Sequence, residues 1–247
     1  MQYLLETTQT VPEGVGFALY GPTHLVWLAI FLIFTLGSCL LYRELRSTQK
    51  DKVRLVFAAL LLADELFKYV ILTVGDRWLA DYLPLHLCSV NIFLIAIHAV
   101  RPNKLLDNFL YTVCIPGALA ALLFPSWASL PFPNLMHIHS FTVHTLLAAY
   151  PIMLTSAGEI RPSARYVPKC LALLVVLCIP GIVVNLFFGS NFMFLSYAEP
   201  GNPLYLFEQL WGNHLYGLPI LVGAVILIMH APRLLLKDVL ERRHSIY

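Results

Sequence analysis

Residues 22–42 read PTHLVWLAIFLIFTLGSCLLY, a run of 21 residues without one Lys, Arg, Asp or Glu. A helix needs about 20 apolar residues to cross the hydrocarbon core of a bilayer, so this stretch predicts a transmembrane helix. The rest of the chain has the same character. Its 247 residues are 59% hydrophobic and 12% charged, whereas an ordinary soluble domain is about 25% charged. We predict an all-α integral membrane protein.

Further apolar runs of similar length follow along the whole chain, and polar or Pro- and Gly-containing segments separate them. The predicted spans are residues 22–42, 54–74, 83–100, 106–124, 136–155, 168–188 and 213–233. Because these runs cover the sequence evenly, we expect residues 1–247 to form a single transmembrane domain. The expected architecture is a bundle of about seven helices, and the expected location is the cell membrane, crossed many times.

The basic residues predict the orientation of this bundle. If the connections between spans are numbered alternately, one set holds 14 of the 16 Lys and Arg residues. These are Arg43, Arg46, Lys50, Lys52, Arg54, Arg101, Lys104, Arg161, Arg165, Lys169, Arg233, Lys237, Arg242 and Arg243. The other set holds only Arg77, and Lys68 lies inside a span. Since cytoplasmic loops carry the excess of Lys and Arg, we expect the N-terminus outside and the C-terminus in the cytoplasm.

Composition also narrows the expected partners. The formal net charge is +2, and no basic cluster alternates with aromatic residues as in a groove that binds nucleic acid. We therefore expect the bilayer and a phospholipid or acyl-chain substrate as partners, and no nucleic acid. The sequence contains no motif for a cofactor, so none is expected, and it predicts no particular oligomeric state.

Six of the nine histidines fall toward the outer ends of four predicted spans. They are His24, His86, His137, His139, His144 and His214. Polar residues within a span usually face the bundle interior or a wet cavity, so we expect the group to line a cavity that opens outward. For His24, His137 and His214 taken singly, an ordinary interfacial position is the alternative.

The second span contains three charged residues, Asp64, Glu65 and Lys68, in the segment LLADELFKYVIL. Each charge at the centre of a bilayer costs roughly 2.5–3.5 kcal/mol on insertion scales. Lys68 is at i+4 from Asp64 and at i+3 from Glu65, so it can pair with either on one helix face. One carboxylate remains over, and it can hold a histidine or stay protonated. Either a functional site or a polar network that joins helices explains the cluster.

Residues 83–91 read LPLHLCSVN and open the third span. On a regular helix His86 and Cys88 point roughly 160° apart, while Asn91 shares the face of Cys88. A base for Cys88 must then come from another helix, and the fifth span, with MHIHSFTVH, is the best source. His137 and His144 share one stripe there, and His139 points elsewhere.

Two chemistries fit these residues. In the first, His144 takes the proton of the Cys88 thiol, Glu65 orients the imidazole and Asn91 supports the site. His86, His137, His139, Asp64 and Lys68 are then substrate-binding or supporting residues. In the second, several histidines hold a zinc ion for lipid hydrolysis, but two ligands on one helix prefer i,i+3 or i,i+4 spacing, which is missing here. We therefore expect no metal ligands. A non-enzymatic transporter or ligand-binding protein that uses the charged cluster is the remaining alternative.

Three short segments carry a resemblance to a known family: LPLHLC at 83–88, HTLL at 144–147 and NFMFL at 191–195. With these, the chain from about residue 15 to 235 resembles the YwaF family of bacterial integral membrane proteins. That family is similar in turn to the animal acyltransferase family of transmembrane protein 164. The resemblance implies acyl transfer on phospholipids through a cysteinyl thioester with the help of a histidine. The implied cysteine is Cys88, and the implied histidine is His144.

Overall fold

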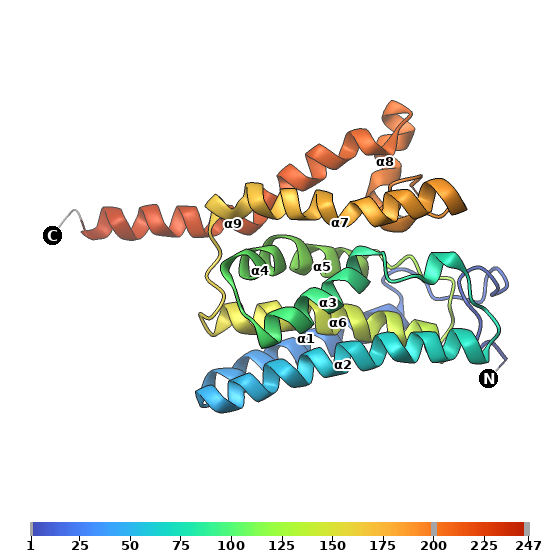
Figure 1. Ribbon diagram of the computed structural model, residues 1–247, viewed down its shortest axis with the longest axis horizontal. Coiled ribbons are helices and arrows are strands. Elements are labelled where there is room, and N and C mark those ends of the chain that lie inside the picture. The colour runs from blue at the N-terminus through green and yellow to red at the C-terminus, as the bar shows by residue number, and fades with distance from the viewer. Residues whose placement is uncertain (1, 199–201, 245–247) are drawn as a thin grey trace.

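The computed structural model describes residues 2–198 and 202–244, with the side chains of the last helix described as far as Ala231. Over these ranges all regular secondary structure is helical (Figure 1). The α-helices are α1 Pro22–Glu44, α2 Ser47–Val74, α3 Leu87–Val100, α4 Lys104–Phe109, α5 Ile115–Leu123, α6 Leu135–Ser156, α7 Val167–Phe188, α8 Pro203–Trp211 and α9 Leu218–His244. The short 3-10 turns are η1 Ala80–Tyr82, η3 Ala164–Tyr166, η4 Phe192–Phe194 and η5 His214–Gly217, and η2 Leu110–Cys114 is π-helical.

Each predicted span overlaps one helix or helices that follow one another directly, although the ends differ. Five segments of the described chain are long and apolar enough to cross a membrane. They are Pro22–Glu44, Ala80–Val100, Lys104–Leu123, Ala164–Phe188 and His214–Ala231. The two other long helices, α2 and α6, have sufficient length but contain the buried charged residues and the histidines.

Helix α6 lies at the centre of the bundle and packs against α1, α2, α3 and α5 (Figure 1). Most of its side chains are buried, from Met136 to Leu154. The outermost helices have the opposite character, since α7 exposes Leu186 and Phe187, each at 80%. Apolar surface of this extent is typical of a protein that faces lipid. The more polar helix is thus inside and the most apolar helices outside, as a bilayer requires.

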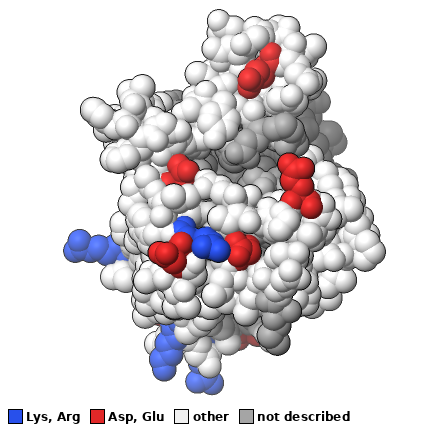
Figure 2. Space-filling view, turned by 90° about the vertical axis from the view of Figure 1, so that its right-hand side faces the viewer, with Lys and Arg blue, Asp and Glu red and all other residues white. Residues whose placement is uncertain are grey.

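The two ends of the bundle differ in charge. Basic side chains gather where α1, α3 and α6 end and α2, α4 and α7 begin, and we call this the basic end. The opposite end carries acidic side chains and few basic ones (Figure 2). We call it the acidic end.

The N-terminal segment, residues 2–20, covers the acidic end. Arg77 forms an ion pair of 3.1 Å with Glu6, and its hydrogen bonds hold the pKa of the Glu6 carboxyl below its ordinary value. The amide of Phe17 donates to the carbonyl of Ala128 at 2.9 Å. At Gly16 a Cβ atom would lie 2.1 Å from that same carbonyl oxygen, so only glycine permits this close approach. The segment thereby fixes the loop that precedes α6.

Candidate active site

Lys68 and Glu65 form a buried ion pair on α2, with Lys68 Nζ 2.5 Å from Glu65 Oε1. Their side chains are 8% and 6% exposed. The ammonium also lies 4.7 Å from the centre of the Tyr69 ring, where the negative face of the ring attracts a cation. The i,i+3 pairing that the sequence predicts is therefore confirmed, and one positive charge is fixed inside the bundle.

The carboxylate left over is that of Asp64, and it faces His139 on α6. Asp64 Oδ2 lies 2.9 Å from His139 Nδ1. The angles do not satisfy a hydrogen bond, and both atoms lack a hydrogen-bond partner among the described residues. Distance and burial nevertheless make this an electrostatic contact between α2 and α6. A histidine contact is one of the two alternatives that the sequence leaves open for the spare carboxylate.

His86 does not lie on a helix, contrary to the prediction of a span that begins at residue 83. It is the N-cap of α3, with extended backbone at φ −68° and ψ 150°, and the helix begins at Leu87. The separation of roughly 160° expected for His86 and Cys88 on a regular helix therefore does not apply, because it requires helical backbone at both positions. The His86 ring lies 4.8 Å from the Phe192 ring, and its Nδ1 accepts a long hydrogen bond, 3.4 Å, from the Met193 amide.

The turn that contacts His86 has strained backbone. Met193 and Phe194 have φ angles of 57° and 55°, a left-handed conformation that costs roughly 1–3 kcal/mol per non-glycine residue. Asn185 on α7 holds the turn: its side chain accepts from the Phe192 amide at 2.7 Å and donates to the Phe192 carbonyl at 3.2 Å. Phe192, Met193 and Phe194 belong to the NFMFL segment. That segment therefore forms a turn that contacts the head of α3.

Cys88 lies in the first turn of α3, half-buried and packed against the main core. Helix α2, which carries Glu65 and Lys68, packs against α3. A second thiol, Cys114 in η2, is within electrostatic range of Cys88 and donates to the Leu147 carbonyl of α6 at 3.5 Å. The head of α3 therefore meets α2 on one side and η2 on another.

His144 on α6 is fixed in a single tautomer. Its Nδ1 lies 2.7 Å from the Ser140 carbonyl oxygen. A carbonyl oxygen only accepts, so Nδ1 carries the proton and Nε2 of the neutral ring is the acceptor. The sequence predicts that Glu65 orients this imidazole; instead Glu65 bonds to Lys68, and the backbone carbonyl does the orienting. No hydrogen bond joins His144 to Cys88 in the described residues.

Trp127 completes the surroundings of His144 and is missing from the sequence prediction. Its indole stacks on the imidazole with ring centres 5.0 Å apart and planes at 13°. The indole nitrogen is buried without a hydrogen-bond partner among the described residues. Trp127 belongs to the loop that Phe17 and Gly16 fix, so the N-terminal segment positions it indirectly. No local pattern in the sequence identifies this contact.

The other histidines of the acidic end bond to separate partners rather than to a shared point. His24 accepts from the Tyr20 amide and donates to the Leu122 carbonyl. His214 donates from Nε2 to the Phe194 carbonyl, with the Glu208 carboxylate 3.8 Å from its Nδ1. Of the six histidines grouped in the sequence, His86, His139 and His144 remain as candidates for a common site.

His137 is a structural residue, because both of its ring nitrogens are occupied. Nδ1 donates to the Leu130 carbonyl at 2.9 Å, and Nε2 accepts from the Trp27 indole at 2.9 Å. It connects α6 to α1 and to the loop before α6. It therefore has no free nitrogen for proton transfer.

We predict that His137→Phe destabilises the protein by about 1–3 kcal/mol, because the buried donor of Trp27 and the Leu130 carbonyl lose their partner. Unfolding in detergent, followed by tryptophan fluorescence, measures this loss. Any activity per folded molecule should stay at the wild-type level. An unchanged unfolding midpoint would contradict the structural role.

Several buried polar atoms around α2, α3 and α6 have no hydrogen-bond partner in the described chain. They include Asn91 Oδ1, Thr145 Oγ1, Asp64 Oδ2, His139 Nδ1 and Trp127 Nε1. Buried polar groups are normally satisfied, so unsatisfied ones need an explanation such as water or a ligand. Among the described residues no group of three or more His, Cys, Asp and Glu side chains is arranged to hold a metal ion.

Long apolar helices around a buried core of charged residues and histidines define an all-helical membrane protein. Residues 19–230 match the model of the TMEM164 family, and the chain belongs to that family. Comparison with curated proteins finds no match, and neither does comparison with solved structures.

Proposed function

We propose that this protein is a lipid acyltransferase that carries the acyl group on Cys88 and uses His144 as its base. Membership of the TMEM164 family supports a membrane protein. The observation that carries the proposal is the orientation of His144, whose Nδ1 donates to the Ser140 carbonyl at 2.7 Å, so that Nε2 is the nitrogen left for proton transfer. The thiol, the base and a fixed positive charge belong to three neighbouring helices, α3, α6 and α2.

The proposal includes the topology that the sequence predicts. The chain crosses the cell membrane seven times as a single domain, with the N-terminus outside, and it resembles the YwaF proteins. The alternate course of the helices in Figure 1 supports this, as do the opposite charges of the two ends. Helices α2 and α6 cross although they are more polar, because their polar side chains face each other inside the bundle. The acidic end, with Cys88 and His144, is then the outer one.

The proposed reaction has two steps. His144 Nε2 takes the thiol proton of Cys88, directly or through one water, and the thiolate attacks the ester carbonyl of a phospholipid. The ester C–O bond breaks, the lysophospholipid alkoxide receives the proton from His144, and a thioester remains on Cys88. In the second step a lysophospholipid hydroxyl gives its proton to His144 and attacks the thioester. The new ester forms, and the cysteine leaves as thiolate and regains the proton.

The neighbouring groups have supporting roles in this scheme. Lys68 and Glu65 form a buried ion pair on α2, the helix that packs against α3. Asp64 and His139 join α2 to α6, and Asn91 offers an unpaired oxygen to the substrate. Trp127 fixes the plane of the His144 ring. His86 contacts η4 through the Met193 amide and the Phe192 ring.

The proposal is tested with purified protein in vesicles that contain a phospholipid with a labelled acyl chain and an unlabelled lysophospholipid. We predict that wild-type protein moves the label to the lysophospholipid. His144→Ala should lower the rate by about 10²–10⁴-fold, the usual contribution of a general base. His137→Phe is the matched control, since His137 lies on the same helix with both nitrogens occupied. Equal rates for wild type and His144→Ala would exclude the proposed base.

A further inference from the structure

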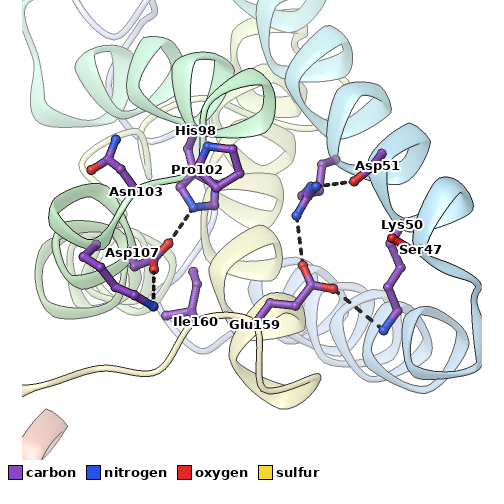
Figure 3. Close-up of a pocket in the computed structure, with 11 residues that line it drawn as sticks. Ser47, Lys50, Asp51, His98, Pro102, Asn103, Asp107, Glu159 and Ile160 are labelled. Atoms are coloured by element: carbon purple, nitrogen blue, oxygen red, sulfur yellow. Dashed lines mark hydrogen bonds and ion pairs between the residues drawn. The ribbon is translucent and has the colours of Figure 1, made fainter.

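The basic end of the bundle contains a cavity of about 610 Å³ that the acyl-transfer scheme does not use. Its walls come from the start of α2, the connection between α3 and α4, and the residues after α6. Figure 3 shows Lys50 and Glu159 on one side, with His98 and Asp107 on the other. The volume is within the usual range of about 300–1,000 Å³ for small-molecule sites.

The carboxylates of this cavity are already occupied by donors of the protein itself. Glu159 accepts from the Tyr42 hydroxyl and from Arg54 Nη1, each at 3.0 Å. Asp51 pairs with Arg54 Nη2. Asp107 lies 2.9 Å from His98 Nε2. A cationic ligand would have to compete with each of these contacts.

The basic side chains of the cavity, in contrast, still have hydrogen-bond donors without a partner in the described residues. Arg54 Nε is buried and has no hydrogen-bond partner among the described residues. Lys50 makes one ion pair, a loose one of 3.7 Å to Glu159, and Lys104 makes one of 3.6 Å to Asp107. An ammonium group has three donors and a guanidinium has five. The cavity therefore has more donors to offer than acceptors.

The excess of positive charge around the cavity also favours an anionic ligand. In the described segments of the basic end, ten Lys and Arg residues stand against four Asp and Glu residues. The basic ones are Arg43, Arg46, Lys50, Lys52, Arg54, Arg101, Lys104, Arg161, Arg165 and Lys169, and the acidic ones are Glu44, Asp51, Asp107 and Glu159. A concave site within such a field concentrates anions.

We propose that this cavity binds a phosphate group, held by Lys50, Arg54 and Lys104. A phosphate offers several acceptor oxygens in different directions, which suits donors that come from separate walls. The group is either the head group of an anionic lipid or a soluble phosphate ester. The site lies at the opposite end from Cys88 and does not depend on its chemistry.

The test uses full-length protein in phosphatidylcholine nanodiscs and the thermal unfolding midpoint as readout, since a ligand that binds the native state raises it. One arm titrates glycerol 3-phosphate, and the other adds phosphatidic acid to the nanodisc. Lys104→Gln is the main variant, because this lysine is 64% exposed in its side chain and its loss should not impair folding. Lys50→Gln is the second variant. Lys52→Gln removes an exposed charge from the same end without lining the cavity.

We expect at least one arm to stabilise the wild type, with affinity about tenfold or more weaker in Lys104→Gln and Lys50→Gln. Lys52→Gln should bind as the wild type does. Stabilisation in the glycerol 3-phosphate arm assigns a soluble ester, and stabilisation by phosphatidic acid alone assigns a lipid. The proposal is overturned if neither arm stabilises the protein, if both cavity variants bind like the wild type, or if Lys52→Gln weakens binding as much as they do.

Discussion

Cys88→Ala is expected to abolish acyl transfer, with a loss of about four orders of magnitude or a fall to background. The reason is that no thioester can form without the Cys88 thiol. The assay is label transfer between phospholipid and lysophospholipid in vesicles. The folded fraction of the variant is measured in parallel, so that a loss of activity is not confused with unfolding.

Cys114→Ala is the matched control for this result. Cys114 is the neighbouring thiol, is fully buried and donates to the Leu147 carbonyl. Its loss removes one small buried group and should leave transfer near the wild-type rate. If Cys88→Ala keeps wild-type turnover, or if Cys114→Ala loses as much, Cys88 is not the nucleophile.

Lys68→Met is expected to produce the largest loss of stability in the bundle, about 3–5 kcal/mol. The substitution leaves the carboxylate of Glu65 buried at 6% exposure without its cation, and an uncompensated buried charge is strongly destabilising. The measurement is the unfolding midpoint in detergent, by heat or by denaturant.

Two further variants separate the charge from the packing. Lys68→Met combined with Glu65→Gln removes both charges and should recover most of the stability, because no unpaired ion remains. Lys52→Met removes an exposed lysine from the same helix and should change little. A single Lys68→Met variant as stable as the wild type would show that the ion pair contributes nothing to the fold.

The helices were predictable from sequence because apolar runs of membrane length have few alternatives. Their ends were less predictable. Helix α2 begins at Ser47, seven residues before the predicted span, because its first turns are polar and lie outside the apolar run. Helix α3 begins at Leu87 because the preceding histidine is extended and contacts a turn about a hundred residues further on. A contact between residues so far apart in the chain cannot be predicted from local composition.

The sequence predicts those contacts of the candidate site that form between residues close together in the chain. The spacing of Glu65 and Lys68 predicts their ion pair. For the spare carboxylate the sequence leaves a histidine contact or a protonated state open, and Asp64 lies against His139. The orientation of His144 was not predictable, because a backbone carbonyl and the Trp127 indole provide it. Composition likewise gives no sign that the basic residues around Arg54 enclose a cavity.

The most direct measurement of the central claim is mass spectrometry of the protein after incubation with phospholipid. Wild-type protein should gain the mass of one acyl chain, peptide mapping should locate that chain on Cys88, and neutral hydroxylamine should remove it, as it does with thioesters. Turnover of the labelled phospholipid while Cys88 stays a free thiol throughout would contradict the account.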